Sequence, residues 1–318
     1  MTYYTSNFFI NSHKKSRKLG LSILSVMCLF FAKCNYVIHR VWLRLVMGKE
    51  GRQKYFIENH INLGNFLLFE WPIKKNGIKA IPRKDTADYD MLFGMREREI
   101  ELHLGLYKGE TFVDVGSNVG YYTLKAATDF GEDINIVAIE AHPENYKALC
   151  RNIACNGFTN IVTINKAVSD KKGIITLYQH ITNTNRIMTD DPSICIQYEA
   201  KVSSLQVESD SLDNILKENN VHTVDVLKMD IEGAEVLALK AATNTLNQLR
   251  KIIVEIHGEN LEAIKTILQD NGFSVQKIVC ADMHYFDYII GDKVGKNEII
   301  SSDCSNSQKR RMLCDSSK

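Results

Sequence analysis

The sequence of 318 residues has almost no net charge and no cysteine pattern that would assign it to a class of proteins. Its 39 Lys and Arg balance 38 Asp and Glu, so the net charge of +1 provides no general attraction for nucleic acid or an acidic partner. The eight cysteines form no Cys-x-x-Cys pair, and no pair of histidines accompanies them at zinc-finger spacing. This usage favours a reducing, cytoplasmic setting over a framework of disulfides.

The start of the sequence lacks an apolar run long enough to predict a membrane-spanning helix. Residues 19–32 carry no charge, but these fourteen residues fall short of the ~20 that a spanning helix needs. From Val37 to Val46, apolar residues recur at helical spacing, with Arg40 and Arg44 on other faces. We therefore expect residues 1–50 to form an extension whose helix lies on a membrane surface, or packs against the catalytic domain or a second subunit.

The segment from Thr111 to Lys125 predicts a buried strand, a tight turn and a helix. The turn has the sequence Gly116-Ser117-Asn118-Val119-Gly120, and its glycines let a ligand approach the backbone closely. Asp114 adds a carboxylate at the carboxyl end of the strand, where it can hold a cationic or hydroxylated ligand. A strand, glycine turn and helix form the usual ligand cradle of an open α/β sheet, although a corner without a ligand can have the same pattern.

The next predicted strand, residues 134–139, ends at Glu140, twenty-four positions after Gly116. A carboxylate at this place suits the two hydroxyls of a ribose, which a nicotinamide dinucleotide would also present. The dinucleotide fingerprint G-x-G-x-x-G is absent, however, and Asp114 would repel a pyrophosphate. A sulfonium–amino acid ligand tolerates that acid, which points to S-adenosylmethionine.

Four segments together resemble the FkbM-type family of methyltransferases: residues 114–120, 140–145, 227–235 and 254–257. The resemblance extends from about Glu97 to about Gly291 and implies S-adenosylmethionine-dependent O-methylation of a sugar, glycan or other small-molecule hydroxyl, without one substrate. It implies that Glu97 lies near the cofactor and that adenine rests beside Lys166–Val168. The predicted cofactor-binding residues are Glu97, Asp114, Gly116, Ser117, Asn118, Gly120, Glu140 and Ala167.

The expected fold is α/β, a Rossmann-like class I methyltransferase sheet with helices on both faces and an N-terminal helical extension. The sheet is mostly parallel and closes with an antiparallel pair at residues 273–279 and 285–290, while residues 173–178 and 200–204 form an inserted hairpin around a polar loop at 183–192. The expected organisation is an extension at 1–50, a cover segment at 51–96 with short strands at 62–71 and 77–81, the methyltransferase domain at 97–300 and a disordered tail at 301–318.

Acids and a histidine follow the fourth and fifth predicted strands, and Asp230, His257 and Glu255 are the predicted catalytic residues. A neutral imidazole with a pKa near ~6.5 suits proton removal from a hydroxyl. A divalent metal bridging Asp230, Glu255 and His257 is also chemically reasonable, although no metal-binding residue is assigned. Glu232 is interpreted as structural, holding the turn and capping the next helix.

Two other classes of protein remain as alternatives. An NAD-dependent oxidoreductase would share the acid at Glu140, but lacks support from the glycine turn. A catalytically silent, membrane-anchored binding module would not need acids at the strand ends, and these are present. Calorimetry with S-adenosylmethionine and with NAD separates these alternatives.

Overall fold

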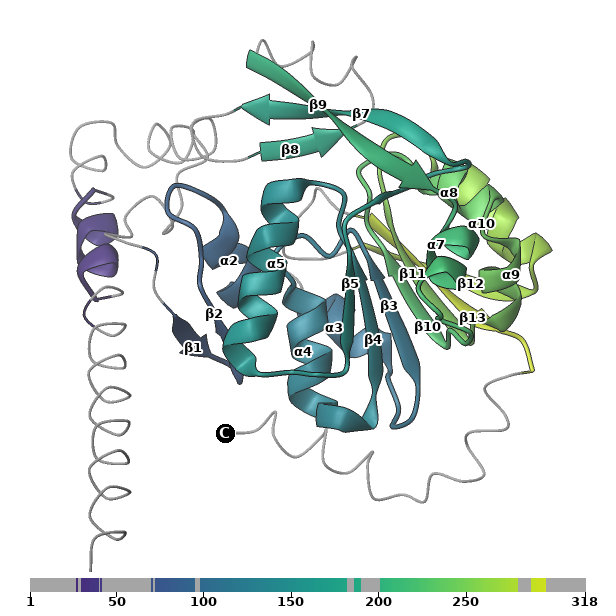
Figure 1. Ribbon diagram of the computed structural model, residues 1–318, viewed down its shortest axis with the longest axis horizontal. Coiled ribbons are helices and arrows are strands. Elements are labelled where there is room, and N and C mark those ends of the chain that lie inside the picture. Colours follow the sequence, from purple (N-terminus) through teal and green to yellow (C-terminus); the bar gives the residue numbers. More distant parts are fainter. Residues whose placement is uncertain are drawn as a thin grey trace, which may run out of the picture.

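The computed structural model describes residues 27, 30–39, 41, 70, 72–94, 98–181, 186–189, 201–279 and 287–295 (Figure 1). Glu97, most of the strand predicted at 62–71 and the tail predicted at 301–318 lie outside these residues. The predictions made for them stay predictions.

A seven-stranded sheet forms the centre of the fold, in the order β12-β13-β11-β10-β3-β4-β5 (Figure 1). The strands are β3 (Thr111–Val115), β4 (Asn135–Ile139), β5 (Ile161–Ile164), β10 (Val226–Met229), β11 (Lys251–Ile256), β12 (Phe273–Val279) and β13 (Asp287–Lys293). Neighbouring strands from β5 to β11 pair in parallel, and β13 pairs antiparallel with both β11 and β12. The expected parallel sheet with a closing antiparallel pair is therefore confirmed.

Helices cover both faces of this sheet because β3 and its neighbours are apolar on both sides. Val113 and Val115 join one core cluster with the helices α7 (Leu212–Glu218), α8 (Glu235–Lys240), α9 (Thr243–Gln248) and α10 (Leu261–Asp270). Phe112 points to the other face, which α3 (Arg98–Leu104), α4 (Tyr121–Phe130) and α5 (Pro143–Asn156) cover. Successive strand residues alternate between faces, so one short strand supplies both cores.

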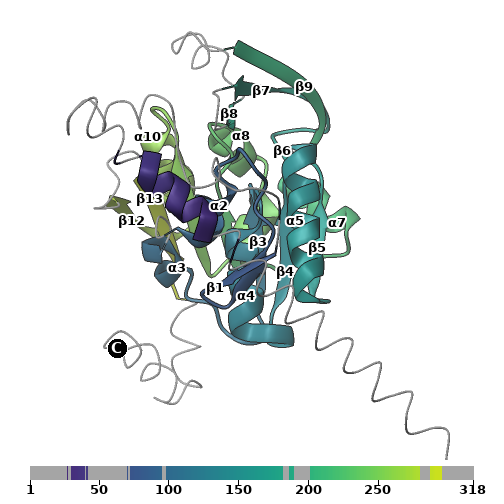
Figure 2. The same ribbon diagram turned by 90° about the vertical axis from the view of Figure 1, so that its left-hand side faces the viewer.

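A second sheet, of order β6-β9-β7-β8, stands over the carboxyl ends of the central strands (Figures 1 and 2). Its strands are β6 (Ala167–Val168), β7 (Gly173–Ile181), β8 (Arg186–Thr189) and β9 (Lys201–Asp210). The antiparallel pair β7–β9 matches the predicted inserted hairpin. The prediction of a polar loop at 183–192 was wrong in part, because residues 186–189 form strand β8, which pairs with β7.

The described part of the cover segment belongs to the core of the domain. It forms β1 (Ile73–Lys75), β2 (Ile78–Ala80) and α2 (Asp88–Phe93). The fully buried Asn152 of α5 accepts a hydrogen bond from the Ile81 N–H at 2.8 Å and donates to the carbonyl oxygen of Val119 at 2.9 Å. One side chain thus ties the cover segment to the glycine turn.

An N-terminal helix, described at residues 27, 30–39 and 41, lies at the edge of the molecule (purple in Figures 1 and 2). Its Ala32 is fully buried in the cluster that contains Ile73 and Leu92, and Tyr36 packs against the same cluster. One face of the helix therefore packs on the domain. Within the described residues, no helix is both long enough and apolar enough to cross a membrane.

Candidate active site

The glycine turn after β3 is packed directly against the end of β10. Gly116 has a left-handed conformation with φ 76°, and its N–H donates to the carbonyl oxygen of Ile139 at 2.9 Å. A Cβ on Gly116 would lie 1.7 Å from the carbonyl oxygen of Asp230. The protein's own backbone therefore requires glycine here, and the approach of a ligand to Gly116, which borders the cleft, stays a prediction.

Two other predicted residues of the turn shape it from within. The hydroxyl of Ser117 donates to the carbonyl oxygen of Asp114 at 2.6 Å, and its side chain is buried. A Cβ on Gly120 would lie 2.6 Å from a methyl of Leu149 on α5. Both residues therefore fix the backbone that borders the site, and neither borders it with a side chain.

Asp114 points away from the site, toward the face covered by α4. Its carboxylate is fully buried, accepts a hydrogen bond from the Thr123 hydroxyl at 2.6 Å and lies 3.9 Å from the Lys228 amine. Burial raises the pKa of Asp114, and the Lys228 charge opposes that rise. Asp114 thus supports the turn from beneath, in place of the direct cofactor contact expected from the sequence.

A cleft opens above the carboxyl ends of the strands, with about 780 Å³ of space not filled by protein atoms. This space includes the open mouth of the cleft. Of the predicted site residues, Gly116, Asn118, Glu140, Ala167 and Asp230 border it. The wall beside Ala167 is apolar and is completed by Val168, Ile175 and Leu177, the last two from β7.

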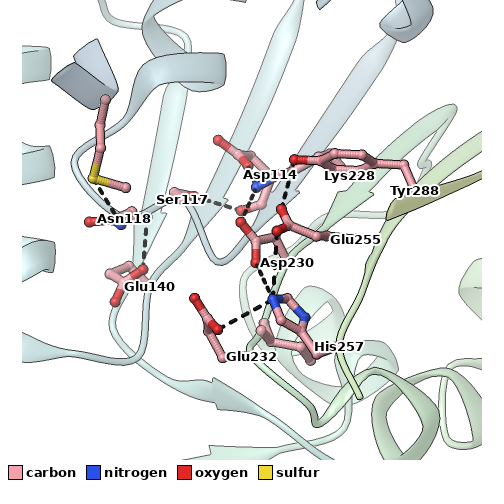
Figure 3. Close-up of polar contacts among 12 residues, drawn as sticks. Asp114, Ser117, Asn118, Glu140, Lys228, Asp230, Glu232, Glu255, His257 and Tyr288 are labelled. Carbon is pink, nitrogen blue, oxygen red and sulfur yellow. Dashed lines mark hydrogen bonds and ion pairs between the residues drawn. The ribbon is translucent and has the colours of Figure 1, made fainter. Parts of the chain in front are cut away.

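Glu140 follows β4 and is held in place by backbone donors. One carboxylate oxygen accepts a hydrogen bond from the N–H of Asn118 at 2.8 Å (Figure 3). The other accepts from the N–H of His142 at 2.9 Å. Burial raises the pKa of Glu140 to about 7, while the two backbone hydrogen bonds oppose the rise. The carboxylate is thus fixed in orientation, and both Glu140 and Ala167 border the cleft.

Acids surround His257 at the ends of β10 and β11 (Figure 3). Its Nδ1 lies 2.8 Å from an oxygen of Glu235. Its Nε2 lies 3.3 Å from Glu232, 3.6 Å from Glu255 and 3.9 Å from Asp230. The structure therefore brings the three predicted catalytic residues together and adds two more carboxylates.

The neighbouring strands support two of these acids from behind. Lys228 is buried and places its amine 3.3 Å from Asp230, while the Tyr288 hydroxyl of β13 donates to Glu255 at 2.8 Å. Asp230 is the one predicted catalytic residue that borders the cleft, and Glu255 and His257 lie behind it.

The charge state of His257 differs from the sequence expectation. Burial alone lowers its pKa, but the hydrogen bond to Glu235 and the charges of Glu232 and Asp230 raise the pKa to about 10. The imidazole is then cationic at neutral pH. This differs from the neutral imidazole with a pKa near ~6.5 expected from the sequence, since a protonated imidazole cannot accept a further proton. The catalytic role of His257 stays a prediction.

Glu232, interpreted from the sequence as holding the turn, borders the cleft. Glu235 holds the turn instead, because its Oε1 accepts from the N–H groups of Ile231, at 3.3 Å, and Gly233, at 3.0 Å. Glu232 has φ 55° and borders the cleft with its carboxylate 3.3 Å from His257. Desolvation raises its pKa to about 7, against the charge of His257. A non-glycine residue in this backbone conformation is uncommon, and the sequence pattern does not reveal it.

Three of these groups have the geometry of metal ligands. One donor atom each of Asp230, Glu255 and His257 lies within 4.8 Å of the others. The Nε2 of His257 is buried without a hydrogen-bond partner, and Glu235 binds the opposite ring nitrogen. A carboxylate behind a histidine is the usual support for a metal-binding ring.

The strand order and the site define the class of protein. Numbered along the chain, the seven central strands lie in the order three, two, one, four, five, seven, six, with the seventh antiparallel and the cleft at the carboxyl ends. This is the class I fold of S-adenosylmethionine-dependent methyltransferases.

Residues 114–275 match the methyltransferase FkbM domain, so the chain belongs to the FkbM family of methyltransferases. It is 26% identical over 147 residues to hexuronic acid methyltransferase AglP of Haloferax volcanii, a match that covers 45% of this chain and 54% of the relative. The chain thus spans about half the length of that relative. Methyltransferase sdnD of Sordaria araneosa is 24% identical over 194 residues, covering 52% and 74% of the two chains.

Among solved structures, M. jannaschii TYW2 in complex with AdoMet is similar with a TM-score of 0.39 and 15% sequence identity, covering 70% of this chain and 85% of that one.

The lining of the cleft fits the cofactor of this family. The apolar wall at Ala167 suits an adenine ring, and the Glu140 carboxylate suits ribose hydroxyls. Asp230 and Glu232 lie at the opposite end, where acids suit the positive sulfonium.

Proposed function

We propose that the chain is an S-adenosylmethionine-dependent O-methyltransferase that acts on a hydroxyl of a sugar, glycan or other small-molecule acceptor. The observation that carries this proposal is one cleft bordered by Glu140 and, at one end, by Asp230 and Glu232. Membership of the FkbM family and the similarity to a hexuronic acid methyltransferase support it.

Binding depends on residues that the fold has already oriented. Glu140 accepts hydrogen bonds from the ribose hydroxyls, and the wall at Ala167 receives the adenine. Gly116 and Asn118 provide the backbone surface between them. When bound, the cofactor supplies an electrophilic methyl group on sulfur. The contribution of the protein is to hold the acceptor oxygen in line with that group, and alignment can provide a large part of the acceleration.

The acceptor hydroxyl must lose its proton as its oxygen bonds to the methyl carbon and the carbon–sulfur bond breaks. Glu232 takes this proton, because its carboxylate borders the cleft and has a pKa raised to about 7, near the pH of the reaction. Asp230 borders the same end of the cleft, where its negative charge stabilises the positive sulfonium. The imidazolium of His257 holds both carboxylates in place, while Glu255 and Glu235 hold His257.

A divalent ion is a second mode of action at the same place. The converging atoms of Asp230, Glu255 and His257 favour it, as does the Nε2 of His257, which makes no hydrogen bond and faces these carboxylates. Such an ion, when bound, would acidify a hydroxyl as a Lewis acid. His257 would then bind as the neutral imidazole, so metal binding would release its proton.

Calorimetry and an isotope assay test the proposal. The full chain should bind S-adenosylmethionine and not NAD, and should transfer a labelled methyl group to a hydroxyl in a panel of uronic acids and neutral sugars. Binding of NAD alone would refute the methyltransferase assignment. Transfer of the label to nitrogen or carbon acceptors only would refute O-methylation.

Variants and a chelator separate the two modes. Glu232→Gln should lower turnover by ~10²-fold with little change in cofactor affinity, whereas the exposed Glu259→Gln should leave turnover unchanged. A chelator should have no effect if Glu232 is the base. If it removes activity and Mg²⁺ or Mn²⁺ restores it, the ion replaces Glu232 in this role. Full turnover of Glu232→Gln without any chelator effect would leave alignment as the sole source of catalysis.

A further inference from the structure

The N-terminal helix has an apolar face directed away from the domain. Ala32, on the inward side, is 0% exposed, while Ile38, on the outward side, is 64% exposed. Large apolar side chains recur on the outward side at helical spacing, and all of them are exposed: Met27, Phe30, Phe31, Val37, Ile38 and Val41. We call these six residues the outer stripe.

The outer stripe is not a scatter of single exposed residues. At 100° per residue its six members lie within about a third of the helix circumference, opposite Ala32 and Tyr36. The rings of Phe30 and Phe31 also contact each other edge to face, with centroids 5.9 Å apart. Contiguous exposed apolar patches mark interaction sites, whereas isolated ones are ordinary.

Charge identifies the partner of this stripe. The first 49 residues contain eight Lys and Arg and no Asp or Glu, while the remaining 269 contain 31 basic and 38 acidic residues. In the sequence, the outer stripe therefore lies within a segment of net charge +8, whereas the remaining residues have a net charge of −7. Lys33 is exposed within the described helix. This asymmetry is hidden in the net charge of +1.

A second copy of the chain is the less favourable partner. Two copies that meet through the same face would bring two acid-free, basic segments together, which costs electrostatic free energy. An anionic lipid surface has the complementary charge and an apolar layer beneath its headgroups. A helix with an apolar stripe and a basic surrounding lies in the plane of such a surface.

We propose that the outer stripe docks the enzyme onto an anionic lipid bilayer, with the helix parallel to the membrane. The apolar side chains enter the boundary between headgroups and acyl chains, and the basic residues contact the headgroups. The inward face stays bound to the domain through Ala32 and Tyr36, so the catalytic domain is held at the membrane surface.

Vesicle flotation with the full chain tests this proposal. The protein should float with phosphatidylcholine vesicles that contain about one third phosphatidylglycerol, remain at the bottom with pure phosphatidylcholine, and be released in part by high salt. A double variant of the outer stripe, Phe30→Ser with Ile38→Ser, should lower the vesicle-bound fraction by ~10-fold or more.

A matched control uses apolar residues of equal exposure elsewhere. Leu102, 70% exposed on α3, and Ile174, 61% exposed on β7, are changed to serine together and should leave flotation unchanged. Thermal unfolding and S-adenosylmethionine binding should be the same for both double variants, which separates docking from folding and from the methyltransferase proposal. The proposal is overturned if the control variant loses as much of its vesicle-bound fraction as the stripe variant, or if the wild-type chain does not float. A dimer in light scattering that the stripe variant converts to a monomer also overturns it, in favour of a second copy.

Discussion

Substitution of Glu140 gives the sharpest test of the cofactor site, because its ionisation affects binding and folding in opposite directions. Glu140 is 5% exposed, and burial raises its pKa to about 7 from 4.5. Ribose hydroxyls donate hydrogen bonds best to the ionised carboxylate. With a pKa of about 7, the ionised fraction is roughly 10% at pH 6 and 90% at pH 8. The apparent affinity for S-adenosylmethionine should therefore rise about tenfold over this range.

The stability of the cofactor-free protein should change with the opposite sign. The folded-state pKa of Glu140 lies above that of the unfolded chain, so the folded state binds more protons between pH 4.5 and about 7. The contribution of Glu140 is fully present below pH 4.5 and is lost as the pH rises through about 7. The difference between these pKa values corresponds to about 3 kcal/mol.

In the Glu140→Gln variant, neither cofactor affinity nor stability should depend on pH through residue 140. Glutamine cannot ionise, and it offers one acceptor where the carboxylate offers two, so the N–H of Asn118 or His142 loses its partner. We expect the variant to be less stable than wild type by about 1–3 kcal/mol at low pH, to lack the loss of stability that Glu140 causes as the pH rises through 7, and to bind the cofactor about 10- to 100-fold more weakly. The exposed Glu144→Gln, on the same loop and helix start, is the control and should behave as wild type.

Calorimetric titration of S-adenosylmethionine at pH 6, 7 and 8 and urea unfolding at the same pH values measure these effects. Ionisation of the ligand's own amine affects binding to wild type and to Glu140→Gln alike, so comparing the two proteins isolates the effect of Glu140. The reasoning is refuted if wild type and Glu140→Gln show the same dependence of affinity on pH, or if the variant binds the cofactor as tightly as wild type.

Three further predictions concern the surrounding structure. Gly116→Ala should lower the urea-unfolding free energy by at least ~3 kcal/mol, whereas Gly109→Ala, with φ 85° and nothing within 4 Å of the added Cβ, should cost only about 1 kcal/mol; equal losses would contradict the packing argument. Glu235→Gln should lower the pKa of His257 below about 10 in an NMR titration, and an unchanged value would exclude the hydrogen bond as its cause. Lys228→Met should destabilise the fold by ~3–5 kcal/mol at pH 8 and by less at pH 4, since it leaves two neighbouring carboxylates without their cation; a loss that does not vary with pH would show that packing dominates.

Local patterns in the sequence were enough to predict the central sheet. Each parallel strand is a short, mainly apolar run followed by glycine or a polar residue. The small helices α2 and α9 were not predicted, because six residues are too few for a periodic pattern. Strand β8 was taken for a loop because its short segment is surrounded by polar residues.

The sequence indicated which residues stand near the strand ends, but not which way their side chains face. Asp114 and Glu140 both stand near a strand end, but Asp114 lies within β3 and faces α4, whereas Glu140 follows β4 and faces the cleft. Which face a helix covers is decided by tertiary packing. The charge of His257 depends on Glu235, twenty-two residues earlier in the chain, so no local pattern contains it.

The hydrogen bond between Tyr288 and Glu255 has a consequence for the order in which the site forms during synthesis. Tyr288 lies on β13, which is inserted between β11 and β12 and is the last strand of the sheet in the chain. On the ribosome, the strands that form the cofactor cleft emerge first, and the support for Glu255 emerges at least 33 residues after Glu255 itself. A nascent chain can therefore form the cofactor site before the acid cluster is complete. Catalytic competence should follow cofactor binding during synthesis, so a chain that stalls before β13 would hold the methyl donor without a finished acceptor site.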